Sequence, residues 1–194
     1  MIQLDTSTAL RGQTVPTPDT VPTPDTVPTT GETSAVVGQS APRLRRIGES
    51  DLTVFPLAIS GNVFGWTADD ATTNAILDSY AAQGGNFIDT ADSYAAGRSE
   101  TMIGNWMRSR RNRSEVVIAT KVGKSADNPG LRARVLTRAV HASLQRLGTD
   151  RIDLLYLHID DETVEFEETL LAVDELIRAG AVRYFGGSDH TGNR

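Results

Sequence analysis

The chain has 194 residues, of which 39% are hydrophobic and 23% are charged, and its formal net charge at pH 7 is −6. This length is sufficient for one sizeable hydrophobic core, and the acidic balance with scattered arginines argues against a nucleic-acid partner. The absence of cysteine excludes disulfides, thiolate nucleophiles and cysteine-ligated zinc, and the three histidines lie too far apart in the sequence to predict a metal site.

The first 43 residues differ in composition from the rest of the chain. The hexapeptide VPTPDT occurs at 15–20 and again at 21–26, and proline, threonine and aspartate dominate the segment. Such a segment cannot bury enough apolar surface to offset the entropy lost on ordering, so we predict a disordered leader over 1–43. It lacks the charged start and long apolar run of a secretory signal, and no stretch is long enough to span a membrane. We therefore expect a cytoplasmic protein with no membrane partner; its oligomeric state is open.

From Leu44 onward, short apolar runs alternate with helix-period segments, which predicts one domain over 44–194. The predicted strands are 54–60, 86–90, 116–121, 152–158 and 182–187. A helical segment is predicted in each interval between them, and in the last two intervals apolar residues recur at steps of three and four. Alternation of this kind is typical of a parallel sheet covered by helices, either doubly wound or closed into a barrel. The turn-like GESD at 48–51 separates two strand-like pieces and favours a short hairpin before the sheet.

Helix ends are also marked in the sequence. Thr67 and Asp70 have the spacing of a capping box at the start of the first helix. Gly84, Gly148 and Gly180 stand where helices are expected to end.

Polar side chains stand at the carboxyl ends of four successive predicted strands. Asp89 ends the second, Lys121 the third and His158 the fourth, while Ser188 and Asp189 follow the fifth. Parallel α/β folds place their active sites at this edge. Each residue alone has a plain structural explanation, such as a turn cap or a core histidine. Together, and with Tyr94 in the loop after the second strand, they favour an active site.

The chemistry of these groups suits the reduction of a carbonyl. Tyr94 could donate a proton to the carbonyl oxygen, and a nearby ammonium such as that of Lys121 would favour the phenolate left behind. Asp89 could hold the ammonium in place, and His158 could donate a hydrogen bond to the carbonyl oxygen. No residue supplies a hydride, so a cofactor is implied. The familiar glycine-rich dinucleotide fingerprint is absent, because SGNVFG at 60–65 has the wrong spacing.

These residues resemble the aldo-keto reductase family. FIDTADSYAAGRSE, VVIATKVG and IDLLYLH are similar to the strands that carry the family's aspartate with tyrosine, lysine and histidine, and LLAVDELIRAGAVRYFGGSDH is similar to its fifth strand. The resemblance covers roughly 44–194. It implies a (β/α)8 TIM barrel, of which about five of eight units are present, and reduction of aldehydes or ketones to alcohols in a site without metal. The implied cofactor is NADPH, with NADH as the alternative.

The resemblance also assigns roles to individual positions. Asp89, Tyr94, Lys121 and His158 match the catalytic tetrad. The implied cofactor-binding residues are Gly61, Asn62, Asp89, Ser188 and Asp189. Asp189 stands where the family usually has asparagine, and Ser60 with Gly61 stands where Gly-Thr is common.

The family's last three strands do not occur in the 194 residues. We therefore expect a fragment or a truncated product that is not a competent reductase by itself. The alternative is a non-catalytic module that retains the fold for interaction or for cofactor sensing. The complete tetrad favours the enzyme.

Overall fold

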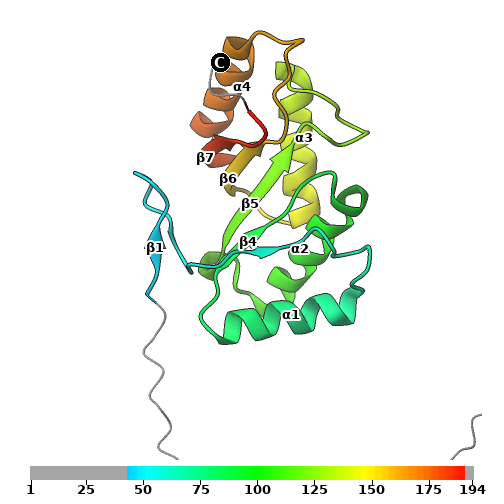
Figure 1. Cartoon of the computed structure of the whole chain (residues 1–194), viewed down its shortest axis with the longest axis vertical. Helices are drawn as coiled ribbons and strands as arrows, with labels where there is room; N and C mark the ends of the chain where they lie inside the picture. The colour runs from blue at the N-terminus through cyan, green and yellow to red at the C-terminus, as the bar shows by residue number, and fades with distance from the viewer. Residues whose placement is uncertain (1–42, 191–194) are drawn as a thin grey trace, which may run out of the picture. The chain divides into compact units, whose positions relative to one another are not determined.

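The computed structural model of the chain describes residues 43–190, which form a five-stranded parallel sheet with helices along one face (Figure 1). The predicted disorder of the leader lies outside the described residues, except for Arg43. No helix within 43–190 is both long enough and apolar enough to cross a membrane.

The strands of the sheet lie side by side in the order in which they occur in the chain. They are β3 (Ile59–Ser60), β4 (Phe87–Asp89), β5 (Val117–Val122), β6 (Ile152–Leu157) and β7 (Val182–Gly187). Every neighbouring pair is parallel, as the alternating sequence pattern predicted. In the described part of the chain, β3 and β7 are the two edges of the sheet.

A short antiparallel hairpin precedes the sheet. It pairs β1 (Arg45–Arg46) with β2 (Thr53–Val54), which confirms the predicted hairpin around GESD. The single strand predicted over 54–60 is wrong, because β2 ends at Val54 and β3 begins only at Ile59. Pro56 lies in the break, and proline has no N–H to give to a strand ladder.

Four α-helices and two short 3₁₀ helices connect the strands. They are α1 (Asp70–Ala82), η1 (Tyr94–Gly97), α2 (Arg98–Arg110), η2 (Arg113–Glu115), α3 (Ala133–Leu147) and α4 (Phe166–Arg178). The predicted capping box is wrong: Asp69 is the N-cap of α1, and its Oδ1 accepts a 2.8 Å hydrogen bond from the Thr72 amide. A carboxylate adjacent to the first turn satisfies a free N–H there, so Thr67 is not needed as a cap.

The glycines predicted at helix ends are all in place. Gly148 caps α3, and Gly84 and Gly180 follow the ends of α1 and α4. All three have positive φ angles, between 62° and 84°. This backbone conformation is accessible to glycine without a steric cost.

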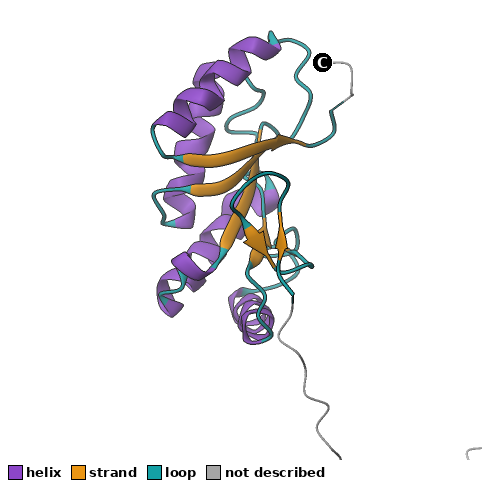
Figure 2. Ribbon diagram, turned by 90° about the vertical axis from the view of Figure 1, so that its left-hand side faces the viewer, coloured by secondary structure: helices purple, strands orange, loops and turns teal. Residues whose placement is uncertain are grey.

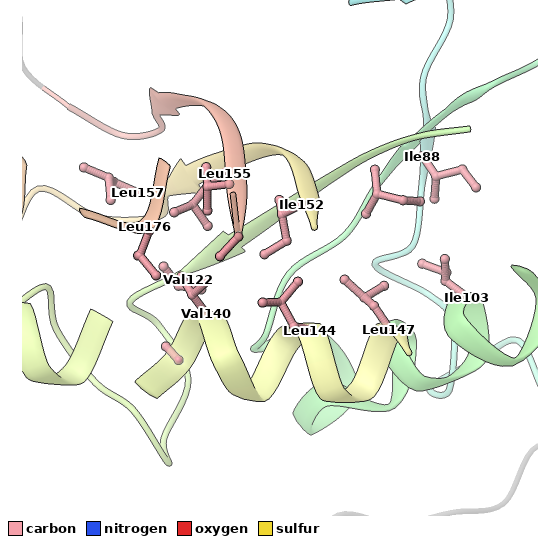
Figure 3. Close-up of a cluster of buried hydrophobic side chains, with 14 of the residues drawn as sticks. Ile88, Ile103, Val122, Val140, Leu144, Leu147, Ile152, Leu155, Leu157 and Leu176 are labelled. Carbon is pink, nitrogen blue, oxygen red and sulfur yellow. The ribbon is translucent and has the colours of Figure 1, made fainter. Parts of the chain in front are cut away.

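The main hydrophobic core lies between the sheet and the helices (Figure 3). Apolar residues of β4, β5 and β6 meet residues of α2, α3 and α4 there. Its members include Ile88, Ile103, Val122, Val140, Leu144, Leu147, Ile152, Leu155, Leu157 and Leu176. A second, smaller cluster lies on the other face of the sheet, where Leu52 and Val54 of the hairpin region pack against Val117, Ala119 and Leu154.

The two faces of the sheet decide where the functional groups lie. Helices cover one face, and the hairpin lies at the other (Figure 2). Because side chains alternate along a strand, a residue two or four positions after a member of the smaller cluster points to the same face. Lys121 follows Val117 and Ala119 in this way, and His158 follows Leu154. The hairpin face therefore changes from apolar to polar toward the carboxyl ends of the strands.

Candidate active site

Backbone hydrogen bonds align the carboxyl ends of the strands. The amide of Asp92 donates to the Lys121 carbonyl (2.9 Å), that of His158 to Val122 (2.9 Å) and that of Ser188 to Leu157 (2.9 Å). These bonds continue the parallel ladder past the last strand residues. The polar groups predicted at four strand ends are thereby held along a single edge.

Asp89 and Lys121 form the closest charged contact at this edge. Lys121 Nζ lies 2.6 Å from both carboxylate oxygens of Asp89 and also donates to the Thr90 carbonyl at 3.1 Å. Only 12% of the Lys121 side chain and 23% of the Asp89 side chain are exposed. An ammonium that gives three hydrogen bonds in a half-buried position has little freedom to move.

The same ammonium group reaches the phenol of Tyr94. Lys121 Nζ lies 3.4 Å from Tyr94 Oη and 5.1 Å from the centre of its ring. Tyr94 opens the short helix η1, in which Ala95, Ala96 and Gly97 all have left-handed backbone angles. Three such residues in succession turn the chain tightly and hold the tyrosine over the strand ends.

His158 completes the group from β6. Its ring lies edge-on to that of Tyr94, with ring centres 6.1 Å apart. Burial, assisted by the charges of Lys124 and Lys121, lowers the pKa of His158 to about 4, while Asp189 opposes this effect. The imidazole is therefore neutral at neutral pH, with one ring nitrogen as a donor and the other as an acceptor. All four residues of the predicted tetrad come together in the structure.

A cavity of about 370 Å³ opens beside this group. Its wall contains Ser60, Asp89, Lys121, Tyr156 and Ser188, together with Ala58, Phe87 and Gly187. Of the residues predicted to bind a cofactor, Asp89 and Ser188 line it directly.

The other three predicted cofactor residues do not line the cavity. Gly61 is buried; its amide donates to the Asp89 carbonyl (2.7 Å) and its carbonyl accepts from Ser99 Oγ (2.8 Å). A Cβ at Gly61 would lie 2.5 Å from Ser99 Oγ, so a larger residue could not keep this approach. Asn62 is exposed. Asp189 is also exposed, and it pairs with Lys124.

A second ionisable group is buried between Asp89 and Tyr94 in the sequence. Asp92 is 2% exposed, and within 43–190 neither of its carboxylate oxygens has a hydrogen-bond partner of good geometry. Burial, and next the nearby Glu100 carboxylate, raise the pKa of Asp92 to about 7, against a smaller opposing effect of Arg146. The nearby backbone amides of Gly123 and Ser93 also lower this pKa slightly. Glu100 itself is satisfied: it accepts 2.6 Å hydrogen bonds from Thr120 Oγ1 and Arg146 Nε.

The raised pKa of Asp92 predicts a pH-dependent stability that Asp92→Asn removes. Between about pH 4 and pH 7 the folded chain keeps a proton that the unfolded chain releases, so the free energy of unfolding falls as the pH rises through this window. Each pH unit corresponds to about 1.4 kcal/mol at most. The free energy of unfolding of Asp92→Asn, relative to that of the parent, should therefore be on the order of 2 kcal/mol higher at about pH 8 than at about pH 5.

Urea unfolding of both proteins at the two pH values measures this gain. The matched control is Asp127→Asn, which neutralises an exposed aspartate in the loop after β5 and should show no such trend. Parallel pH curves for parent and Asp92→Asn would contradict the prediction.

Several residues of this region were not predicted from the sequence. Tyr156 could have been found, because it lies two residues before His158 on a strand whose alternate residues share a face. Lys124 and Thr90 could not, because Lys124 lies in an irregular loop and Thr90 contributes its backbone carbonyl. No periodic pattern marks such contacts.

The parallel sheet with its helices is part of a (β/α)8 barrel. Asp89, Tyr94, Lys121 and His158 form one group at the carboxyl ends of its strands. The profile of the Aldo/keto reductase family matches residues 58–193, well over half of the chain. The chain belongs to the aldo/keto reductase family, as its sequence motifs indicated.

Similar proteins include two fungal enzymes. Norsolorinic acid reductase B of Aspergillus parasiticus is 38% identical over 171 residues, which are 77% of this chain and 45% of that protein. A putative aryl-alcohol dehydrogenase, AAD14, of Saccharomyces cerevisiae is 38% identical over 166 residues, 76% of this chain and 44% of that protein.

Solved structures show the same likeness. The holo form of aldo-keto reductase AKR11C1 from Bacillus halodurans has a TM-score of 0.69 and 33% identity over 76% of this chain and 50% of that chain. The chain thus spans less than half the length of the two fungal relatives and about half of this structure.

Proposed function

We propose that the protein containing these residues reduces aldehyde or ketone carbonyls to alcohols with NADPH. The observation that carries the proposal is the contact of one half-buried ammonium group, that of Lys121, with both a carboxylate and a phenol. The family match and the names of the relatives support the same reaction class.

Tyr94 acts as the proton donor in this proposal. Its hydroxyl lies 3.4 Å from the Lys121 ammonium, and a positive charge at this distance stabilises the phenolate that proton transfer leaves. Asp89 keeps the ammonium charged and oriented through two 2.6 Å bonds. Neutral His158 donates a hydrogen bond to the carbonyl oxygen and so fixes the substrate against the phenol.

The residues around the cavity fit the nicotinamide end of NADPH. A carboxamide presents one acceptor oxygen and an NH2 donor, and the Ser188 hydroxyl can both donate and accept. Ser188 would hold this group, with Asp89 at the same wall and Gly61, Asn62 and Asp189 around it. When bound, NADPH supplies the hydride that reduces the carbonyl carbon, and NADH would supply the same chemistry.

The substrate in this proposal is an aryl carbonyl compound. One relative is named as a putative aryl-alcohol dehydrogenase, and the cavity wall of this chain includes the aromatic rings of Phe87 and Tyr156. Steady-state assays that follow NADPH oxidation with benzaldehyde and with a matched aliphatic aldehyde test both parts of the proposal. Turnover of benzaldehyde at the higher kcat/KM supports it, and absence of turnover with either aldehyde contradicts it.

Lys121→Met is expected to lower turnover by about 10²–10⁴-fold, because the phenol loses the charge that assists its proton transfer. The variant also leaves Asp89 without its cation, so the melting temperature must be recorded beside kcat. Lys121→Arg, which retains a positive charge, is the matched control and should lose less. Parent-like turnover in a folded Lys121→Met variant would remove Lys121 from the mechanism.

A further inference from the structure

An ion pair spans the end of β6 at the same edge of the sheet. Lys124 lies in the loop after β5, and Asp189 lies two residues after β7. Their charged atoms, Lys124 Nζ and Asp189 Oδ2, are 2.7 Å apart. Because β6 lies between the strands from which they come, the two residues bridge two strand spacings, roughly 10 Å of sheet. His158 is the first residue after the strand that they cross.

The backbone of Asp189 suits this contact. Its φ angle is +58°, in the left-handed region that few residues other than glycine, asparagine and aspartate adopt readily. The next residue, His190, closes the turn with Nδ1 2.8 Å from the Ser188 carbonyl oxygen. The turn and the ion pair together fix the segment that carries Ser188.

The charges of Lys124 and Asp189 shift the pKa of His158 in opposite directions. Lys124 lowers the pKa of His158 and Asp189 raises it, and the Lys124 ammonium in turn lowers the pKa of the Asp189 carboxyl. The other charge acting on His158 is that of Lys121 from β5. Without Lys124, Asp189 would place an uncompensated negative charge beside Ser188.

We infer that Lys124 is a positioning residue that makes Asp189 compatible with an anionic cofactor, by cancelling its charge and by tying the loop after β5 to the segment after β7. The inference rests on the proposed function for its effect on cofactor affinity. The ion pair and its influence on His158 do not depend on that function.

The first test measures His158 directly, without cofactor. NMR titration of the imidazole signals in the cofactor-free protein that contains the chain should show the His158 pKa rising by about a few tenths of a unit in Lys124→Met and falling in Asp189→Asn. Lys124→Arg should leave it near the parent value. Arg178→Gln is the control, because it breaks a similar exposed ion pair with Asp174 on α4. A His158 titration that does not respond to Lys124→Met would overturn the inference, whatever the cofactor does.

The second test measures cofactor affinity by NADPH fluorescence titration of the protein that contains the chain. Lys124→Met should weaken binding about two- to five-fold, the scale of an exposed ion pair, and less so in high salt. Adding Asp189→Asn to Lys124→Met should restore the parent affinity, because the uncompensated charge is gone. If the double variant did not recover the parent affinity for NADPH, and the effects of the two substitutions were simply additive, the inference would be overturned. Failure of every variant and of the parent to bind would instead count against the proposed function, and the His158 titration would then decide the inference.

Discussion

Replacing Tyr94 with phenylalanine is expected to reduce carbonyl turnover by about 10²–10⁴-fold, the usual contribution of a positioned acid, and to leave cofactor affinity nearly unchanged. The substitution removes one hydroxyl and keeps the ring. The ring contact with His158 and the position of the ring relative to Lys121 are then preserved. Only the proton donor is lost, so the effect should fall on kcat.

Tyr156→Phe is the matched control for this variant. Tyr156 is a second phenol on the cavity wall, whereas the phenol within hydrogen-bonding distance of Lys121 Nζ is that of Tyr94. Its replacement should leave turnover within a few-fold of the parent. Steady-state kinetics of both variants, with a fluorescence titration of NADPH, measure the difference. If Tyr156→Phe lost turnover and Tyr94→Phe kept it, the acid would be Tyr156.

The sequence predicts the meeting of Asp89, Lys121 and His158 for a simple physical reason. Parallel strands end at one edge, and side chains of equal parity share one face, so three strand-terminal residues converge without knowledge of any loop. The predicted Tyr94 also falls beside them, in a loop of only a few residues whose reach is short. Most of the candidate site is therefore set by regular secondary structure.

The details that were not predicted depend on irregular backbone. Pro56 splits an apolar run that reads as one strand, and Asp69 takes the N-cap role assigned to the pair of Thr67 and Asp70. Burial of Asp92 was also unforeseen, since it stands in a polar stretch. The Lys124 contact with Asp189 joins positions 65 residues apart through two loops. Such contacts follow from tertiary packing, which local patterns do not encode.

The largest effect on stability is expected at Asp153, at the start of β6. This carboxylate is 1% exposed and lies among three arginines. It contacts Arg113 Nη2 at 2.9 Å, Arg183 Nη1 at 3.2 Å and Arg151 Nε at 3.6 Å. It also accepts a 2.9 Å hydrogen bond from the Ile118 amide in β5. The Asp153 carboxylate therefore both neutralises the arginines and accepts a backbone hydrogen bond. It does so at the end of the sheet opposite the candidate site.

Asp153→Ala should lower the free energy of unfolding by about 3–5 kcal/mol, because removing one partner of a buried ion pair leaves the other charge uncompensated. The charge most affected is that of Arg113, whose side chain is only 18% exposed and whose pKa is already lowered, first by burial. Arg183 would keep its second partner, Asp51 in the hairpin turn, at 2.8 Å. The loss should therefore centre on the contact between β5 and β6.

Urea unfolding of Asp153→Ala and of Asp174→Ala measures the difference between a buried and an exposed ion pair. Asp174 pairs with Arg178 on the surface of α4, and its loss should cost no more than about 1 kcal/mol. Asp153→Asn keeps an oxygen that can accept from the Ile118 amide but removes the charge, so its loss should lie between the two. If Asp153→Ala cost no more than Asp174→Ala, the three arginines would be adequately solvated without Asp153, and the cluster would contribute little to holding β5 against β6.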